Sequence, residues 1–94
     1  MIPKQFNILG HVVKVTYDDN LEGMGEAYNS LNYIKLSKFV KGDELPLSVI
    51  EHTYFHELVH VILDSMGEDR LSSSEKFVDT FSGLLHQALK TSKY

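Results

Sequence analysis

The residues with the clearest capacity for chemistry are His56 and His60, which flank Glu57 in the pattern H-E-x-x-H. On an α-helix, residues four apart share one face with β-carbons about 5–6 Å apart, so both imidazoles can bind one zinc ion at adjacent tetrahedral corners. Glu57 lies about 100° around such a helix from His56, where a general base for a zinc-bound water belongs. Because the motif interrupts an apolar stretch, burying these polar groups without partners would be costly. The spacing therefore predicts a zinc site with Glu57 as the catalytic base.

A catalytic zinc site takes three protein ligands, so one more ligand is expected. The downstream side chains able to supply it are Asp64, Glu68, Asp69, Glu75, Asp79 and His86. We select Glu75, because it begins a second predicted helix that can return antiparallel to the first. On that helix Glu75, Asp79, Ser82 and His86 fall within about 60° of one another and are expected to face the first helix. Asp79, one turn after Glu75, is not expected to bind the metal itself. It is expected to accept a hydrogen bond from the ring N–H of a histidine that does.

Ser72 and Glu75 also fit another pattern, the S-x-x-E capping box of a helix N-terminus. If Glu75 bonds a backbone N–H in this way, it cannot fully serve as a ligand as well. Two other histidines are not expected to bind the metal. His52 shares the face of His56 and His60, but three residues so spaced span about 12 Å of helix axis, so we expect His52 to be solvated or hydrogen-bonded. His11 is expected to be structural.

The elements that must position these residues differ between the two halves of the chain. In residues 1–45, β-branched and aromatic residues at period two predict strands. These are expected around Phe6–Ile8 and over His11–Tyr17, Glu26–Asn29 and Asn32–Ser37, in a small antiparallel sheet of three or four strands, with Lys38–Leu45 as a loop.

The second half predicts two helices joined by a polar loop. The first runs over 47–66, ends before Gly67 and is apolar around much of its circumference, so it is expected to be central and covered on two sides. The second helix is capped by Ser72 and ends near Lys90. Its expected apolar face consists of Phe77, Phe81, Leu84, Leu85 and Ala88. The predicted fold is α+β, with the sheet packed on both helices as one domain over 1–94.

Length, charge and composition narrow the function. A chain of 94 residues with no cysteine has room for one core and has no disulfides or cysteine-ligated metal. Its net charge of −4 disfavours nucleic acid as a partner. No signal peptide or membrane-spanning stretch is evident, so we expect a cytoplasmic protein without a membrane partner. The oligomeric state is left open.

The order of these motifs resembles a family of enzymes. His56–His60, followed by Glu75 and then Asp79, is similar to the gluzincin metallopeptidases, whose pattern is H-E-x-x-H, a gap, and E-x-x-x-D on a later helix. The run from Glu75 to Leu85 resembles the glutamate-bearing helix of ImmA/IrrE-type metallopeptidases of phages and prophages. The resemblance covers about residues 25–90.

The resemblance implies a zinc metallopeptidase in which His56, His60 and Glu75 hold Zn²⁺. Glu57 would take a proton from the attacking water and pass it to the leaving amine. A peptide or protein substrate is expected to pair as an added strand along residues 32–37. The possible oxyanion donors are His86, Tyr28, Tyr33 and Tyr94. Two other functions stay open, namely a zinc-stabilised binding module without catalysis and a metal hydrolase with a non-peptide substrate.

Overall fold

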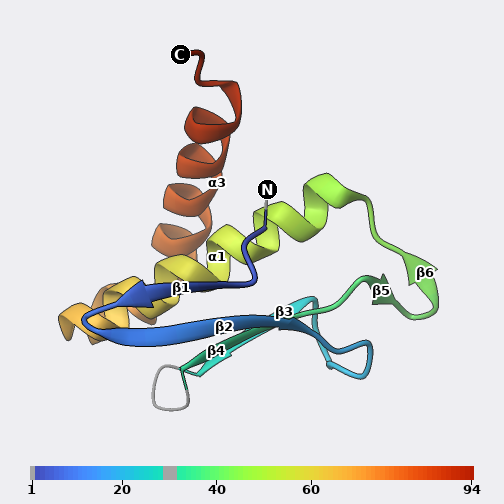
Figure 1. The fold of residues 1–94 in the computed structure, drawn as a ribbon, viewed down its shortest axis with the longest axis horizontal. Helices are drawn as coiled ribbons and strands as arrows, with labels where there is room; N and C mark the ends of the chain where they lie inside the picture. Colours follow the sequence, from blue (N-terminus) through green and yellow to red (C-terminus); the bar gives the residue numbers. More distant parts are fainter. Residues whose placement is uncertain (1, 29–31) are drawn as a thin grey trace.

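The computed structural model describes residues 2–28 and 32–94 and has an α+β fold, as predicted (Figure 1). Its strands are β1 (Gln5–Ile8), β2 (His11–Tyr17), β3 (Gly25–Tyr28), β4 (Tyr33–Leu36), β5 (Phe39–Val40) and β6 (Asp43–Glu44). Its helices are α1 (Leu47–Met66), α2 (Asp69–Ser72) and α3 (Glu75–Thr91). Of the strand predicted over 26–29, Asn29 lies outside the described residues. The predicted loop at 38–45 contains the short β5–β6 hairpin.

The four-stranded sheet has the order β1-β2-β4-β3, and this order corrects two predictions. The sheet is mixed rather than antiparallel, because β2 and β4 run parallel, with Val15 opposite Ile34. After β2 the chain first forms β3 at the far edge and then returns as β4 between the two strands. The segment 32–37, predicted as the free edge, therefore contains an interior strand, and β3 is the edge strand on that side.

One face of this sheet packs against α1, and the alternation of side chains decides which residues lie there. Val13 and Val15 of β2 and Ile34 and Leu36 of β4 are buried on that face with Ile50, Tyr54, Phe55 and Val61 of α1. Side chains of neighbouring positions on these strands point to the opposite face.

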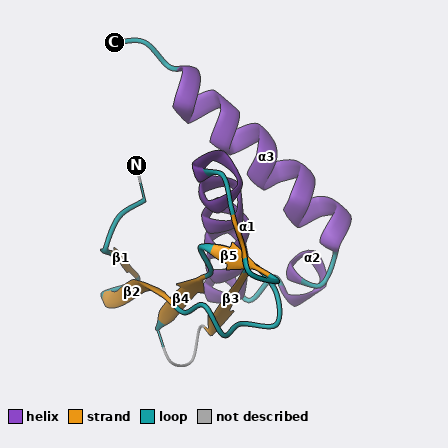
Figure 2. Ribbon diagram, turned by 90° about the vertical axis from the view of Figure 1, so that its right-hand side faces the viewer, coloured by secondary structure: helices purple, strands orange, loops and turns teal. Residues whose placement is uncertain are grey.

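Helix α1 lies between the sheet and α3, so it is covered on two sides as predicted (Figure 2). On the side of α3, Val59 and Leu63 pack against Val78. The helix ends at Gly67, whose φ of 75° is the left-handed conformation that favours glycine and whose N–H bonds the carbonyl of Asp64. Within the described ranges, no helix is long and apolar enough to cross a membrane.

Helix α3 has a different N-cap from the predicted one, and its orientation agrees with the prediction only in part. Its N-cap is Ser74, whose hydroxyl accepts the backbone N–H of Phe77, so the predicted capping box of Ser72 with Glu75 is wrong. The side chains buried against α1 include Val78 and Ser82, whereas Phe81 is 47% exposed. The polar stripe of Glu75, Asp79, Ser82 and His86 faces α1 as predicted, whereas much of the predicted apolar face points outward.

Candidate metal centre

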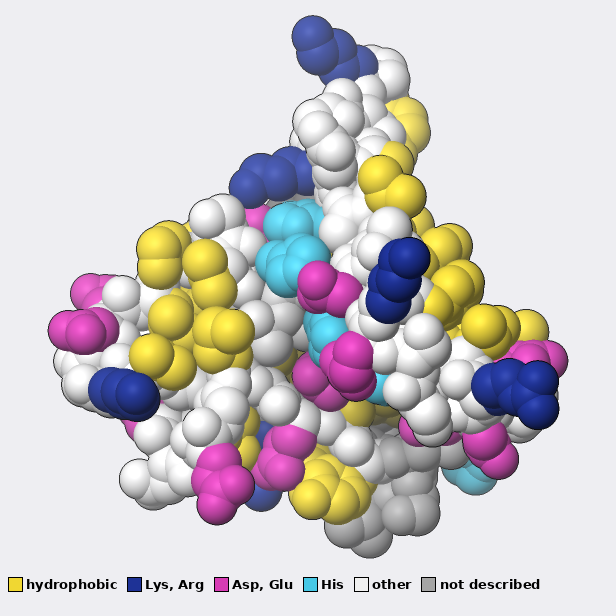
Figure 3. All heavy atoms as spheres, turned by 180° about the vertical axis from the view of Figure 1, so that it is seen from behind, with side chains coloured by type: hydrophobic (Ala, Val, Ile, Leu, Met, Phe, Trp, Pro, Cys, Tyr) yellow, Lys and Arg dark blue, Asp and Glu magenta, His cyan; other side chains and the backbone are white. Residues whose placement is uncertain are grey.

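Three side chains from two helices converge in the way the motif spacing predicts. His56 and His60 project from α1, and Glu75 is the first residue of α3. The Nε2 atom of His56 lies 3.4 Å from Oε2 of Glu75, and the Nε2 atom of His60 lies 3.6 Å from its Oε1. One ligand atom from each residue lies within 4.8 Å of the other two. Histidine and acidic side chains gather in this hollow between α3 and the rest of the protein (Figure 3).

These separations are compatible with a metal ion bound between the three side chains. Ligand atoms about 2.0–2.1 Å from a tetrahedral zinc ion lie about 3.3 Å apart, close to both N···O distances. The arrangement of His56, His60 and Glu75 can hold a metal ion.

The second nitrogen of each histidine ring has its own partner. Nδ1 of His56 lies 3.4 Å from Oδ1 of Asp79, and Nδ1 of His60 lies 3.0 Å from the hydroxyl oxygen of Ser72. A proton on Nδ1 of His60, donated to the Ser72 hydroxyl, leaves the Nε2 lone pair facing Glu75, which is the form that binds a metal. The carboxylate of Asp79 beside Nδ1 of His56 favours the same tautomer in that ring. The predicted role of Asp79 beside a ligand histidine agrees with this geometry.

Ser72 was missed as a supporting residue because sequence reasoning assigned it to a helix cap. It is the last residue of α2, is 8% exposed and is held there by a backbone bond to Glu68. The available signal was a run of three serines before Glu75, of which one suffices to cap α3. The short helix α2 turns the first serine of this run toward His60.

Glu57 lines a cleft of about 210 Å³ beside these residues. The walls of the cleft are formed by Met24, Gly25, His52, Thr53, His56, Glu57 and Asp79. Burial raises the pKa of the Glu57 carboxyl, His56 opposes this, and the negative charges of Glu75 and Glu26 raise the pKa further. Glu57 thus lies in the same cleft as the candidate ligand His56, as the motif predicts.

Gly25 brings the edge strand β3 close to this cleft. A β-carbon at position 25 would lie 2.6 Å from Cγ2 of Thr53 and 3.3 Å from Cγ of Glu57. Real β-carbons do not come as close as the first of these distances, so a residue with a side chain would push β3 away from α1. The absence of a side chain places the backbone of β3 against the wall that contains Glu57.

The predicted oxyanion donors Tyr28 and Tyr33 lie on the wrong face of the sheet. They pair across β3 and β4, with ring centroids 5.2 Å apart. Since Gly25 and Leu36 in the same strands face α1, the period of two directs both tyrosines away from it. Tyr94 is fully exposed beyond the end of α3. The structure therefore removes these three residues from the set of oxyanion donors.

His86, the fourth predicted donor, lies in a different cluster. Its ring stacks on Phe55 with centroids 5.0 Å apart, and its Nε2 atom lies 3.5 Å from Oε1 of Glu51. Glu51 is 5% exposed, and its carboxylate accepts a hydrogen bond of 3.2 Å from Lys90. Burial by itself would raise the pKa of Glu51, but Lys90 and His86 outweigh it and lower the pKa. His86 thus helps to fasten α3 to α1 rather than to serve the cleft.

The remaining histidines behave as expected from their positions. His52 hydrogen-bonds Asp79, with Nε2 lying 3.4 Å from Oδ1. His11 is the exposed first residue of β2. Neither belongs to the group of ligand atoms found within the described residues.

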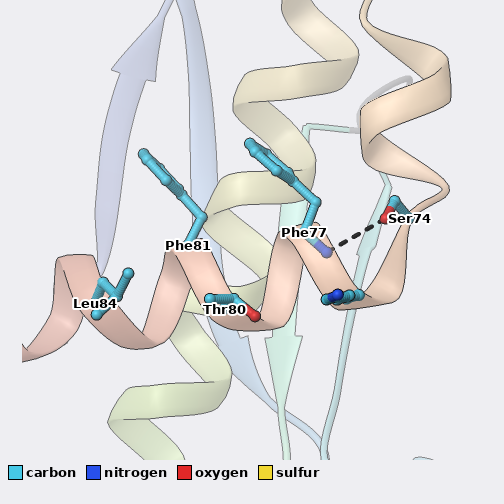
Figure 4. A pocket seen from close by; sticks show the side chains of 6 residues that line it. Ser74, Phe77, Thr80, Phe81 and Leu84 are labelled. Atoms are coloured by element: carbon cyan, nitrogen blue, oxygen red, sulfur yellow. Dashed lines mark hydrogen bonds between the residues drawn. The ribbon is translucent and has the colours of Figure 1, made fainter.

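An apolar hollow of about 410 Å³ lies on the outer surface of α3 (Figure 4). Phe77, Phe81 and Leu84 line it, and the rings of the two phenylalanines stack with centroids 5.7 Å apart. These residues are on the other side of α3 from Glu75 and Asp79, since they lie about 120–180° around the helix from those two residues at about 100° per residue. The hollow is therefore separate from the metal centre.

Comparison of the chain with protein-family models, curated proteins and solved structures found no match in any of the three.

Proposed function

We propose that this protein is a zinc-dependent peptide hydrolase of the gluzincin type. The observation that carries the proposal is the position of Glu57, which lines the same cleft as the ligand His56 and the edge-strand residue Gly25. A metal site with a purely structural role needs no carboxylate beside its ligands. This cleft combines a proton acceptor, one of the proposed metal ligands and a residue of the edge strand.

Zinc is proposed as the metal because of the donor set. Two imidazole nitrogens and one carboxylate match the three-ligand arrangement of catalytic zinc sites, which leave one position free. Among the described residues the cluster comprises three ligand groups, as this arrangement requires. A structural zinc site is typically closed by a fourth protein ligand.

The residues around the cleft have different roles in the proposed hydrolysis. A bound zinc ion supplies Lewis acidity, which polarises a peptide carbonyl and makes water more acidic. Glu57 takes the proton of the attacking water and delivers it to the leaving amine. Asp79 and Ser72 hold the rings of His56 and His60 through their Nδ1 atoms, so that the ligands do not need to reorient during the reaction.

The substrate is proposed to be an extended peptide that pairs with β3 instead of residues 32–37. β3 is hydrogen-bonded to β4 on one side and is the last strand of the sheet on the other. Backbone groups at such an edge bind extended peptides by adding a strand. Gly25 places this edge next to Glu57, so the paired peptide would pass the catalytic carboxylate.

The decisive experiment combines metal analysis with a peptide-library digest. Purified protein is expected to contain one zinc ion per chain and to cleave peptides, whereas Glu57→Gln is expected to retain zinc and to lose cleavage by at least about 100-fold, as for loss of a general base. Glu44→Gln is the matched control, because Glu44 is exposed in β6.

Each alternative function gives a different result in this experiment. Zinc bound without any peptide cleavage by the unaltered protein would favour a binding module or a non-peptide substrate. Cleavage by Glu57→Gln at the rate of the unaltered protein would reject the proposed mechanism.

A further inference from the structure

One oxygen of Asp79 lies between two histidines of α1. Oδ1 of Asp79 is 3.4 Å from Nδ1 of His56 and 3.4 Å from Nε2 of His52. We infer that His52 is a positioning residue of the metal centre, which holds Asp79 in place and through it the ring of His56. The inference rests on the metal-binding part of the proposed function and does not require that the protein cleaves peptides.

The physical need for a second donor follows from the exposure of Asp79. Its side chain is 66% exposed, so water competes for both carboxylate oxygens and the side chain is free to change rotamer. A single contact of 3.4 Å to His56 does little to restrict the rotamer of this exposed carboxylate. A second N–H directed at the same oxygen from one helical turn earlier restricts the carboxylate to the position facing His56.

The ring of His52 lies beside α3. A β-carbon at Gly83 of α3 would lie 3.4 Å from Cε1 of this ring, which is an ordinary contact distance. The ring of His86 lies 6.2 Å from that of His52 on the same side. The side chain is 40% exposed and lines the cleft that contains Glu57.

His52 also has a position that excludes it from the ligand set. The described group of ligand atoms is formed by His56, His60 and Glu75, and the Nε2 atom of His52 is directed at Asp79 instead. Its contribution is therefore expected in the affinity of the metal centre, transmitted through a shared carboxylate, rather than in coordination.

The test measures zinc affinity by competition with a chelator. Loss of Asp79, which contacts a ligand directly, is expected to weaken binding by about 10–100-fold, and His52→Ala, one contact further away, by about three- to tenfold. His52→Gln should bind nearly as well as the unaltered protein, because the glutamine amide carries an N–H donor at the Nε2 position. In an Asp79→Ala background, His52→Ala should have no further effect, since residues that act through a shared partner are not additive.

His11→Ala is the matched control, because His11 is exposed on β2 and should leave zinc affinity unchanged. Unchanged affinity in His52→Ala would overturn the inference. So would equal losses in the presence and absence of Asp79, or a His52→Gln variant as weak as His52→Ala. Circular dichroism checks that each variant is folded, and His52→Gln keeps the test valid if His52→Ala unfolds. A protein that binds zinc but cleaves no peptide would reject the proposed hydrolase and leave this inference intact.

Discussion

The hydroxyl oxygen of Ser72 lies 3.0 Å from Nδ1 of His60, twelve residues earlier in the chain. This contact places the last residue of α2 beside the candidate metal centre. Ser74 caps α3 in its place, so Glu75 is not needed to bond a backbone N–H and is available as a ligand. The connection between α1 and α3 thus brings Ser72 to His60, and α3 begins with Glu75, the third candidate ligand.

Ser72→Ala is expected to weaken zinc binding by about 10–100-fold, because His60 loses the partner that fixes its ring and tautomer. Ser73→Ala is the control, since Ser73 is the exposed neighbouring residue. Zinc affinity is measured by chelator competition, and equal affinities of the two variants would contradict a supporting role for Ser72.

The roles of Glu75 and Asp79 can be distinguished by how much the loss of each side chain weakens zinc binding. Glu75→Ala is expected to nearly abolish binding, as are His56→Ala and His60→Ala, because each removes one of three ligands. Asp79→Ala removes only an acceptor for Nδ1 of His56 and is expected to weaken binding by about 10–100-fold. Titration with zinc checks the order, and a reversed order would show that the ligand is the aspartate.

Gly25→Ala is expected to destabilise the protein by about 1–3 kcal/mol, the usual cost of overpacking. The added β-carbon meets Cγ2 of Thr53 at 2.6 Å. Thr53→Ser removes this methyl group and keeps the hydroxyl that donates to the carbonyl of Val49. The double variant should regain much of the lost stability in thermal unfolding.

Gly23→Ala is the control for this series, because a β-carbon at position 23 meets nothing within 4 Å. If Thr53→Ser fails to rescue Gly25→Ala, the close approach of β3 to α1 is not the cause of the loss.

Acid pH is expected to loosen the attachment of α3 through Glu51. Lys90 and His86 lower the pKa of this buried carboxyl below its usual 4.5 despite the opposing effect of burial. A lowered pKa in the folded state gives a stabilisation that is present above the unfolded pKa and is lost as pH falls through the folded pKa. Metal-free protein should therefore lose stability below about pH 4.5, and Glu51→Gln should lose less over the same range.

Denaturant unfolding of metal-free protein from pH 6 to pH 3 measures this difference. Glu44→Gln serves as the exposed control. Parallel pH profiles for the unaltered protein and Glu51→Gln would show that Glu51 does not contribute to the acid sensitivity.

Removal of zinc is expected to lower the melting temperature. A ligand that binds only the folded state adds a free energy of RT ln(1 + [L]/Kd), here expected at about 1–4 kcal/mol. For a domain of this size, about 1 kcal/mol corresponds to about 4–8 °C. A chelator should have no effect on the His56→Ala/His60→Ala double variant. An unchanged melting temperature of the unaltered protein after verified metal removal would contradict the coupling of metal and fold.

The local parts of this protein were predictable because they depend on neighbouring residues in the chain. The helix over Leu47–Met66, its end at Gly67 and the shared face of His56 and His60 follow from helical period and glycine conformation. The buried pairs Val13 with Val15 and Ile34 with Leu36 follow from the period of two in strands. Glu75 was found because its spacing brings it to the start of a returning helix.

The tertiary structure decided what depends on contacts between distant segments. The insertion of β4 between β2 and β3 made the sheet mixed and moved the open edge from 32–37 to β3, because strand order depends on long-range pairing that local patterns do not encode. The polar stripe of α3 faces α1 as predicted, but only the tertiary structure shows the partner of each side chain, with Asp79 toward His52 and His56 and with His86 toward Glu51. A stripe of polar residues in a sequence does not reveal which residue each of them will contact, because that depends on the partners that the fold supplies for its charges.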